Sequence, residues 1–233
     1  MTAVSESNAL VAVDQPPRSS NERRAEALFG ESLRRAVSVV VALAALVGAA
    51  PILMLLILLI RLDSPGAAIF TQKRVGLKGR EFRLIKLRGM YVDARVRWPE
   101  LYEYSYTQDE AASLRFHIDG DPRVTRVGRF IRRTSLDELP NLLNVLRGDM
   151  NLIGPRPEIP EMLPYYGTAR DVILSVRPGV SSLAKVCGRD GLTLDETIEL
   201  ESDYVRRRSL GLDAKICLLT LSAVLRQHDM AQE

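Results

Sequence analysis

The most prominent pattern in the chain is an apolar run from Ala36 to Ile60, which contains no charged residue. At about 1.5 Å per residue, a helix over this run would be roughly 37 Å long, more than the roughly 30 Å of a bilayer hydrocarbon core. The run therefore predicts a membrane segment. Pro51 follows three small residues near its middle and should kink or break the helix, because proline lacks an N–H group and its ring clashes with the preceding turn.

Basic residues flank both ends of this apolar run. Arg34 and Arg35 precede it, and the cations that follow are Arg61, Lys73, Arg74, Lys78 and Arg80. Cationic flanks prefer the cytoplasmic side, so both ends prefer the same side, which one straight span does not satisfy. We therefore consider a re-entrant membrane hairpin over residues 33–62, built as helix, break at Pro51, helix. An ordinary signal anchor with a proline kink explains this segment equally well.

The polar and apolar positions outside this segment indicate one tail and one domain. Residues 1–32 are mostly polar and show no sustained apolar period, which predicts a disordered N-terminal tail. Residues 63–233 are enough for one compact domain with a modest core. We expect one soluble domain beside one membrane anchor.

Within this domain the pattern predicts a few strands and several helices. Two β-like runs, Ile69–Val75 and Arg80–Leu87, are separated by a short glycine-bounded turn and predict a hairpin. Apolar residues between Val124 and Ile131 alternate with arginines at helical spacing, which predicts a basic amphipathic helix. Leucines after Pro140 and the apolar Leu210–Leu225 segment predict further helices. The expected class is α+β, mainly α, with a small β-hairpin and amphipathic helices at the membrane interface.

Composition narrows the chemistry. The 233 residues carry a net charge of only +3, so the placement of charges matters more than their total. The two cysteines, Cys187 and Cys217, are too few for a disulfide framework, and His117 and His228 are the only histidines. A zinc site and a Ser-His-Asp triad are therefore poorly supported.

The most informative chemical motif is the segment from Thr134 to Pro140, which contains the adjacent carboxylates Asp137 and Glu138. Pro140 is tolerated in a first helical turn, so a helix should begin within a few residues of the acidic pair. Unpaired N–H groups and the helix dipole favour anions there. A purely structural interpretation is a capping box, in which Glu138 bonds back to the backbone of Ser135.

Cations that suit phosphate binding lie on both sides of this motif. Lys86 and Arg88 share one face of the second predicted strand, where two cations could hold a diphosphate or simply protect a strand edge. Arg156 lies between Pro155 and Pro157, so its backbone has little freedom, which suits bidentate phosphate binding. The same residues also fit an ordinary turn.

The motifs occur in an order that resembles the monotopic phosphoglycosyl transferases, a family of bacterial sugar transferases that start glycoconjugate assembly on a polyprenyl phosphate. The resemblance covers about residues 33–225, and the segments that carry it are Lys86-Leu87-Arg88-Gly89-Met90, Asp121-Pro122-Arg123-Val124-Thr125, Thr134 through Pro140, Asn144 through Asp149, Gly154 through Glu158, and Arg177-Pro178-Gly179. The chain looks like a small, single-domain member. The resemblance implies a re-entrant membrane helix and a catalytic domain at the bilayer surface.

The resemblance also implies a role for each motif residue. Asp137 would be the nucleophile that attacks the β-phosphorus of a UDP-sugar, releases UMP and carries the phosphosugar until polyprenyl phosphate accepts it, a ping-pong mechanism. Glu138 would bind Mg²⁺. The cations expected to hold substrate phosphates are Lys86, Arg88, Arg156 and Arg189.

Location and partners follow from the same resemblance. We expect the enzyme at the bacterial inner membrane, with its catalytic domain on the cytoplasmic face. Its expected partners are a UDP-sugar, polyprenyl (undecaprenyl) phosphate and the membrane, with downstream glycosyltransferases and a homodimer as further expectations; no nucleic acid is expected. The product would start an exopolysaccharide, O-antigen, capsule or glycoprotein glycan.

Three positions depart from the family pattern. Gly89 stands where Ser or Thr is usual, residues 180–189 replace a commoner Thr-Gly and Gln-containing version, and Ala50 stands where a serine often precedes the proline. These departures bear on the sugar and on the floor of the pocket, and they spare Asp137 and Glu138.

Two other classes of function remain as alternatives. One is a membrane-tethered scaffold whose basic helix binds anionic lipid, and the other is a Mg²⁺-dependent phosphohydrolase. A scaffold would tolerate loss of the Asp137 carboxylate, and a hydrolase would release phosphate without a lipid acceptor.

Overall fold

The computed structural model describes residues 20–115, 118, 120–188 and 191–229. The chain divides into two units, Met1–Leu33 and Arg34–Glu233. Helix α1 (Ser20–Asp63) supplies the described part of the first unit and continues into the second. The predicted disordered tail over residues 1–32 is therefore wrong for residues 20–32, which are helical, while residues 1–19 lie outside the described residues.

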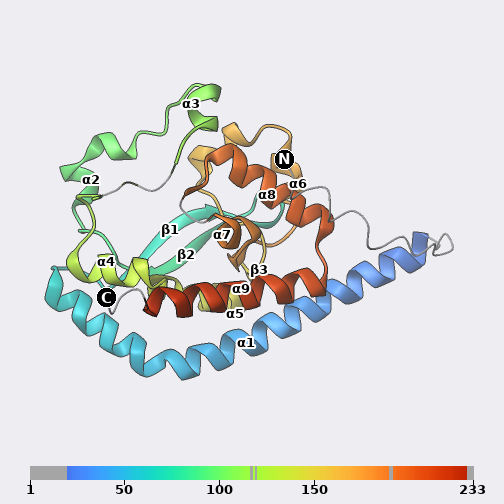
Figure 1. The fold of residues 1–233 in the computed structure, drawn as a ribbon, viewed down its shortest axis with the longest axis horizontal. Coiled ribbons are helices and arrows are strands. Elements are labelled where there is room, and N and C mark those ends of the chain that lie inside the picture. The colour runs from blue at the N-terminus through green and yellow to red at the C-terminus, as the bar shows by residue number, and fades with distance from the viewer. Residues whose placement is uncertain (1–19, 116–117, 119, 189–190, 230–233) are drawn as a thin grey trace. The chain divides into compact units, whose positions relative to one another are not determined.

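Helix α1 is the long apolar element predicted from the sequence. It runs through Pro51 without interruption, and Figure 1 shows it bent near its middle. The predicted break at Pro51, with a separate helix on each side, is therefore corrected. The structure has one continuous helix that bends, because the turns on both sides of the proline remain helical. Within the part of the chain that the structure describes, Phe29–Asp63 is the one stretch long and apolar enough to cross a membrane.

Most of the apolar surface of α1 is not covered by protein. Its buried side includes Ala42, Leu56 and Ile60, which pack into two hydrophobic clusters of the domain. Only 11% of its most apolar window is buried. The exposed large side chains on it include Val37, Val40, Val41, Leu43, Val47, Ile52, Met54, Leu55, Leu58, Leu59 and Leu62. An apolar surface of this size is typical of contact with lipid or another protein.

One end of this apolar segment is bonded to the C-terminal half of the domain. The Arg34 Nε lies 2.8 Å from Asp213 on α9 (Leu210–Asp229). Arg35 donates to the carbonyl oxygens of Leu146 and Met150 at 3.2 and 3.1 Å. Two arginines therefore attach this end of the apolar segment to the domain.

The other end of the segment is bonded to the same domain through Arg88. Its guanidinium donates to the carbonyl oxygens of Ile60 at 3.3 Å and Ser64 at 2.7 Å, and also to that of Pro65. Two of these carbonyls, those of Ser64 and Pro65, follow the last residue of α1, so Arg88 attaches the end of the helix to the domain. Arg88 is 5% exposed and its guanidinium is bonded to these carbonyls, while its role in holding a substrate phosphate stays a prediction.

The predicted hairpin is confirmed. Strands β1 (Ile69–Val75) and β2 (Glu81–Leu87) pair antiparallel, with Ile69 opposite Leu87 and Val75 opposite Glu81. The short turn between them contains Lys78, whose φ of 55° is left-handed, and its N–H donates to the carbonyl of Leu174 at 2.7 Å. The hairpin carries Lys86 into the centre of the domain.

A second small sheet brings distant segments together. Strands β3 (Asn151–Ile153) and β4 (Gly179–Ser181) pair parallel. A Cβ atom at Gly179 would lie 2.1 Å from the backbone nitrogen of Gly154, and one at Gly154 would lie 2.5 Å from the carbonyl oxygen of Arg177. Glycine is thus required on both sides, and this close approach sets the start of the Arg156 loop.

Helices complete the domain around these sheets (Figure 1). The predicted basic helix is α4 (Arg126–Arg133), the leucine-rich helix is α5 (Asn141–Arg147), and the apolar C-terminal helix is α9. The remaining α-helices are α2 (Ala94–Arg97), α3 (Gln108–Ala112), α6 (Ala169–Ile173), α7 (Leu183–Cys187) and α8 (Leu194–Arg207). Short 3₁₀ turns include Leu136–Glu138 and Pro160–Tyr166. The predicted α+β, mainly α class is confirmed.

A buried asparagine joins α5 to the hairpin. Asn144 is 0% exposed, and its Oδ1 accepts from the N–H of Ile85 at 3.1 Å. Its Nδ2 donates to the Arg83 carbonyl at 2.8 Å and to Asp149 at 3.2 Å. The side chain thus satisfies backbone groups on β2 that would otherwise be unpaired in the core.

Arg88→Gln tests the structural role of Arg88. The shorter, neutral side chain cannot reach all three carbonyls, and we expect a loss of about 2–4 kcal/mol and a melting temperature lower by roughly 5–15 °C. Thermal unfolding in one detergent measures this. Arg83→Gln, at an exposed position on the preceding strand β2, is the matched control; equal melting of the two variants would contradict the assignment.

Candidate active site

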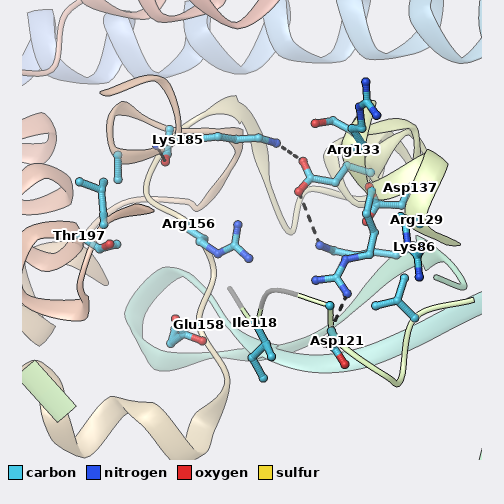
Figure 2. A pocket seen from close by; sticks show the side chains of 18 residues that line it. Lys86, Ile118, Asp121, Arg129, Arg133, Asp137, Arg156, Glu158, Lys185 and Thr197 are labelled. Carbon is cyan, nitrogen blue, oxygen red and sulfur yellow. Dashed lines mark hydrogen bonds and ion pairs between the residues drawn. The ribbon is translucent and has the colours of Figure 1, made fainter. Parts of the chain in front are cut away.

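The domain contains a cavity of about 500 Å³ that is lined by many charged residues, among them the acidic pair. Figure 2 shows carboxylates and cations from several elements facing this space. The charged residues that line it are Lys86, Asp121, Arg129, Arg132, Arg133, Asp137, Glu138, Arg156, Glu158 and Lys185. The cations outnumber the carboxylates, so an anionic ligand is electrostatically favoured here.

A sharp turn of the backbone places the acidic pair. Ser135 has a left-handed conformation with a φ of 57°, and the 3₁₀ turn Leu136–Glu138 follows directly. Pro140 is the N-cap of α5, so a helix begins beside the acidic pair as predicted. The Ser135 side chain makes no capping hydrogen bond, and the capping-box interpretation is therefore wrong.

Glu138 instead holds two lysines. Its Oε1 lies 3.6 Å from the Nζ of Lys86, and its Oε2 accepts from the Nζ of Lys185. Burial by itself would raise the pKa of the Glu138 carboxyl, but Lys185, Lys86 and Arg156 outweigh it and bring the pKa to about 2. Glu138 is therefore ionised at any physiological pH.

Asp137 differs from its neighbour. Burial raises its pKa above the usual value and the nearby Glu138 adds to this, while Lys86 and Lys185 oppose it. A carboxylate with a raised pKa is more basic and hence a better nucleophile than an exposed one. Two adjacent residues of the same chemistry thus have different properties because their environments differ.

The Arg156 loop is held in place by a buried ion pair behind it. Arg74 Nη1 lies 3.0 Å from Glu158 Oε1 and donates to the Pro157 carbonyl at 3.1 Å. Tyr166 donates to the other carboxylate oxygen of Glu158 at 3.3 Å. Arg156 lines the same cavity as Lys86 and both acidic residues, in agreement with its predicted location.

The structure thus brings four of the predicted site residues together, namely Lys86, Asp137, Glu138 and Arg156. Arg88 lies elsewhere, at the end of α1, and Arg189 lies outside the described residues. Pro51 lies within α1, in the apolar segment.

Comparison with known proteins identifies the family. The model of the family described as bacterial sugar transferase matches residues 29–227. The chain belongs to the bacterial sugar transferase family.

Relatives with assigned names span several bacteria. The UDP-glucose:undecaprenyl-phosphate glucose-1-phosphate transferase of Caulobacter vibrioides is 44% identical, over 83% of this chain and 70% of its own length. The exopolysaccharide production protein ExoY of Sinorhizobium fredii is 32% identical, over 84% of this chain and 87% of its own length. Galactosyl transferase CpsE of Streptococcus agalactiae serotype III is 42% identical, over 69% of this chain and 35% of its own length. The chain spans 35 to 42% of the length of several such curated relatives.

Lys185 is the site residue of this bacterial sugar transferase that the sequence did not reveal. It lies on α7, in the segment that departs from the family pattern, and its side chain reaches back to Glu138 across the cavity (Figure 2). Neither spacing nor periodicity signals such a contact, since 47 positions separate the two residues. The arginines of α4 were predicted as a basic face, and three of them, Arg129, Arg132 and Arg133, line the cavity.

The donor set is compatible with a hard divalent cation. No group of three or more His, Cys, Asp and Glu side chains that could hold a metal occurs among the described residues. Mg²⁺, however, commonly uses one or two carboxylates and takes its other ligands from substrate phosphates and water. Glu138 is ionised and faces the same cavity as Arg156 and Lys86, so carboxylate and phosphate oxygens would meet there.

A buried carboxyl behind the site gives this sugar transferase a pH-dependent stability. Glu201 on α8 is 2% exposed, and both of its carboxyl oxygens are buried. Burial raises its pKa to about 7, against the opposing effects of the nearby Ser182 and the Arg156 backbone. Since this value exceeds that of the unfolded chain, the folded state binds the extra proton, and stability falls as the pH rises toward about 7.

Glu201→Gln removes this titration. We expect the melting temperature of the variant to rise relative to the wild type as the pH increases from about 5 to 8, and the difference to level off above about 7. Thermal unfolding across this pH range in one detergent measures the effect. Parallel curves for the two proteins would contradict a buried, titrating Glu201.

Proposed function

We propose that the protein transfers a sugar 1-phosphate from a UDP-sugar to a polyprenyl phosphate such as undecaprenyl phosphate and releases UMP. The observation that carries the proposal is the acidic pair in a cation-lined cavity, with Asp137 made more basic by burial and Glu138 held ionised by two lysines. The Caulobacter vibrioides relative, named as a UDP-glucose:undecaprenyl-phosphate glucose-1-phosphate transferase, supports the same reaction.

The first half-reaction makes Asp137 the nucleophile. A carboxylate oxygen of Asp137 attacks the β-phosphorus, the bond from this phosphorus to the oxygen bridging the two phosphates breaks, and UMP leaves with the electron pair. Lys86 and Arg156 stabilise the charge that moves onto the leaving group. A carboxylate needs no general base near neutral pH, which fits a site that no described histidine lines.

The second half-reaction returns the enzyme to its starting state. A phosphate oxygen of the polyprenyl phosphate attacks the phosphorus bonded to Asp137, the bond between Asp137 and phosphorus breaks, and the carboxylate is restored. The product is a polyprenyl diphosphate sugar, which would start a bacterial glycan. Mg²⁺, held through Glu138, would supply positive charge to the diphosphate.

The apolar face of α1 fits a substrate that lies in the membrane. One reactant is a water-soluble nucleotide sugar and the other is a lipid whose phosphate lies among the head groups. We propose that the segment of α1 from residue 34 enters the cytoplasmic leaflet of the inner membrane and returns to the same side. Hydrogen bonds from both of its ends to one domain support this topology.

Asp137→Asn tests the reaction. With Mg²⁺, polyprenyl phosphate and a panel of UDP-sugars, we expect UMP release from the wild type with at least one sugar, and turnover at least roughly a thousandfold lower in the variant. Glu138→Gln should also lower turnover and raise the Mg²⁺ requirement. Asp109→Asn, at an exposed position on α3, is the matched control.

A label on the donor's β-phosphate separates this mechanism from the alternatives. Without lipid, the wild type should retain label covalently and the Asp137→Asn variant should not. Free phosphate released without lipid acceptor would instead indicate a hydrolase. No Asp137-dependent UMP from folded protein with any sugar would overturn the proposal and favour a lipid-binding scaffold.

Single cysteines at both ends of the apolar helix test the topology. In a background without Cys187 and Cys217, Ser32→Cys and Thr71→Cys place a thiol before and after the membrane segment, both at exposed positions. A membrane-impermeant maleimide should label both in inside-out vesicles and neither in spheroplasts. Labelling of the two from opposite sides would show a simple span.

A further inference from the structure

The carboxylate of Glu138 already has a cation on each of its oxygens. Lys86 lies 3.6 Å from Oε1, and Lys185 bonds to Oε2 from the opposite side of the cavity (Figure 2). The three side chains are similarly shielded from solvent, with exposed fractions of 20% for Lys86, 18% for Lys185 and 16% for Glu138. A divalent cation approaching Glu138 would therefore meet two ammonium groups.

Lys185 is held at this position by the structure around it. It lies on α7, whose N-cap Ser182 accepts from the Lys185 backbone N–H at 3.2 Å. The Lys185 Nζ also lies 3.5 Å from the carbonyl oxygen of Val180. The ammonium thus contacts a carboxylate and a carbonyl oxygen at once, and each is an oxygen ligand of the kind a hard cation uses.

The charge balance decides when a metal can enter. Lys86, Lys185 and Arg156 provide more positive charge than the two carboxylates cancel, so a metal ion alone would increase the excess. A diphosphate reverses this, because its oxygens give the lysines another partner and leave the carboxylate of Glu138 accessible. Metal and diphosphate should therefore bind together more favourably than either does alone.

We propose that Lys185 occupies Oε2 of Glu138 until a nucleoside diphosphate binds, so that binding of the divalent cation and of the diphosphate are coupled. The proposal rests on the proposed function only for the nature of the diphosphate, which is that of a UDP-sugar. Lys185 acts as a positioning residue in this step, because it controls access to Glu138.

The test measures binding and not turnover. Mn²⁺ serves as the probe for Mg²⁺, and electron paramagnetic resonance reports free Mn²⁺ over the full-length protein in detergent, with and without UDP; a sample without protein corrects for the Mn²⁺–UDP complex. In the wild type we expect UDP to tighten Mn²⁺ binding by about 10-fold, within the 5- to 150-fold range typical of coupled sites. By reciprocity, Mn²⁺ should tighten UDP binding by the same factor.

Lys185→Gln should change the metal binding in a specific direction. Without UDP, the variant should bind Mn²⁺ about 5- to 10-fold more tightly than the wild type, and the effect of UDP should shrink accordingly. Lys185→Arg keeps the positive charge and should behave like the wild type. Lys73→Gln removes the lysine of an exposed Lys–Glu pair with Glu81 and is the matched control, with no expected change. Glu138→Gln should abolish Mn²⁺ binding at this site.

Two results would overturn the inference. One is an absence of coupling between Mn²⁺ and UDP in the wild type, and the other is Mn²⁺ binding by Lys185→Gln that is unchanged or weaker while the variant melts at the wild-type temperature. If Lys185→Gln does not fold, the inference is still tested by the coupling between Mn²⁺ and UDP, measured in the wild type and in Lys185→Arg. Asp137-dependent UMP release in the same preparation tests the proposed function separately, so failure of one is distinguishable from failure of the other.

Discussion

The side chain of Asn144 is the constraint on which the arrangement of the site depends. It is fully buried and satisfies the backbone of β2 at Ile85 and Arg83, on either side of Leu84. Because Asn144 lies on the helix that follows the acidic pair, this contact fixes Asp137 and Glu138 beside the strand that carries Lys86. An unpaired amide or backbone group at this depth would cost roughly 1–3 kcal/mol, so the register of helix against strand is strongly determined.

Around this contact, cations and carboxylates lie close enough to shift one another's pKa. The cations keep Glu138 ionised despite its burial, and burial leaves Asp137 more basic than its neighbour. A cavity with excess positive charge favours an anionic ligand such as the proposed diphosphate, whose charge would balance a metal bound beside it. The ion pair of Arg74 with Glu158 holds the binding loop in place, and its carboxylate is one of those that line the cavity.

The long apolar helix depends on the domain at both of its ends. Arg34 and Arg35 bond to α9 and to the end of α5, while Arg88 bonds to carbonyl oxygens at and just beyond the end of the helix. Its apolar surface between these attachments stays uncovered. A helix fixed in this way can present an apolar face to the bilayer while its ends stay with the rest of the domain, which suits the proposed reaction between a nucleotide sugar and a lipid.

Local patterns in the sequence determined the apolar helix, the hairpin, the basic helix and the acidic pair, because apolar periodicity and turn residues act over a few positions. They also located Lys86 and Arg156. Only the tertiary structure decided that Arg88, one residue from a strand end, turns to the carbonyls of α1, and that Lys185 reaches Glu138. Alternation along a strand gives the face of a side chain but not its partner, and a contact between residues 47 positions apart leaves no local signal.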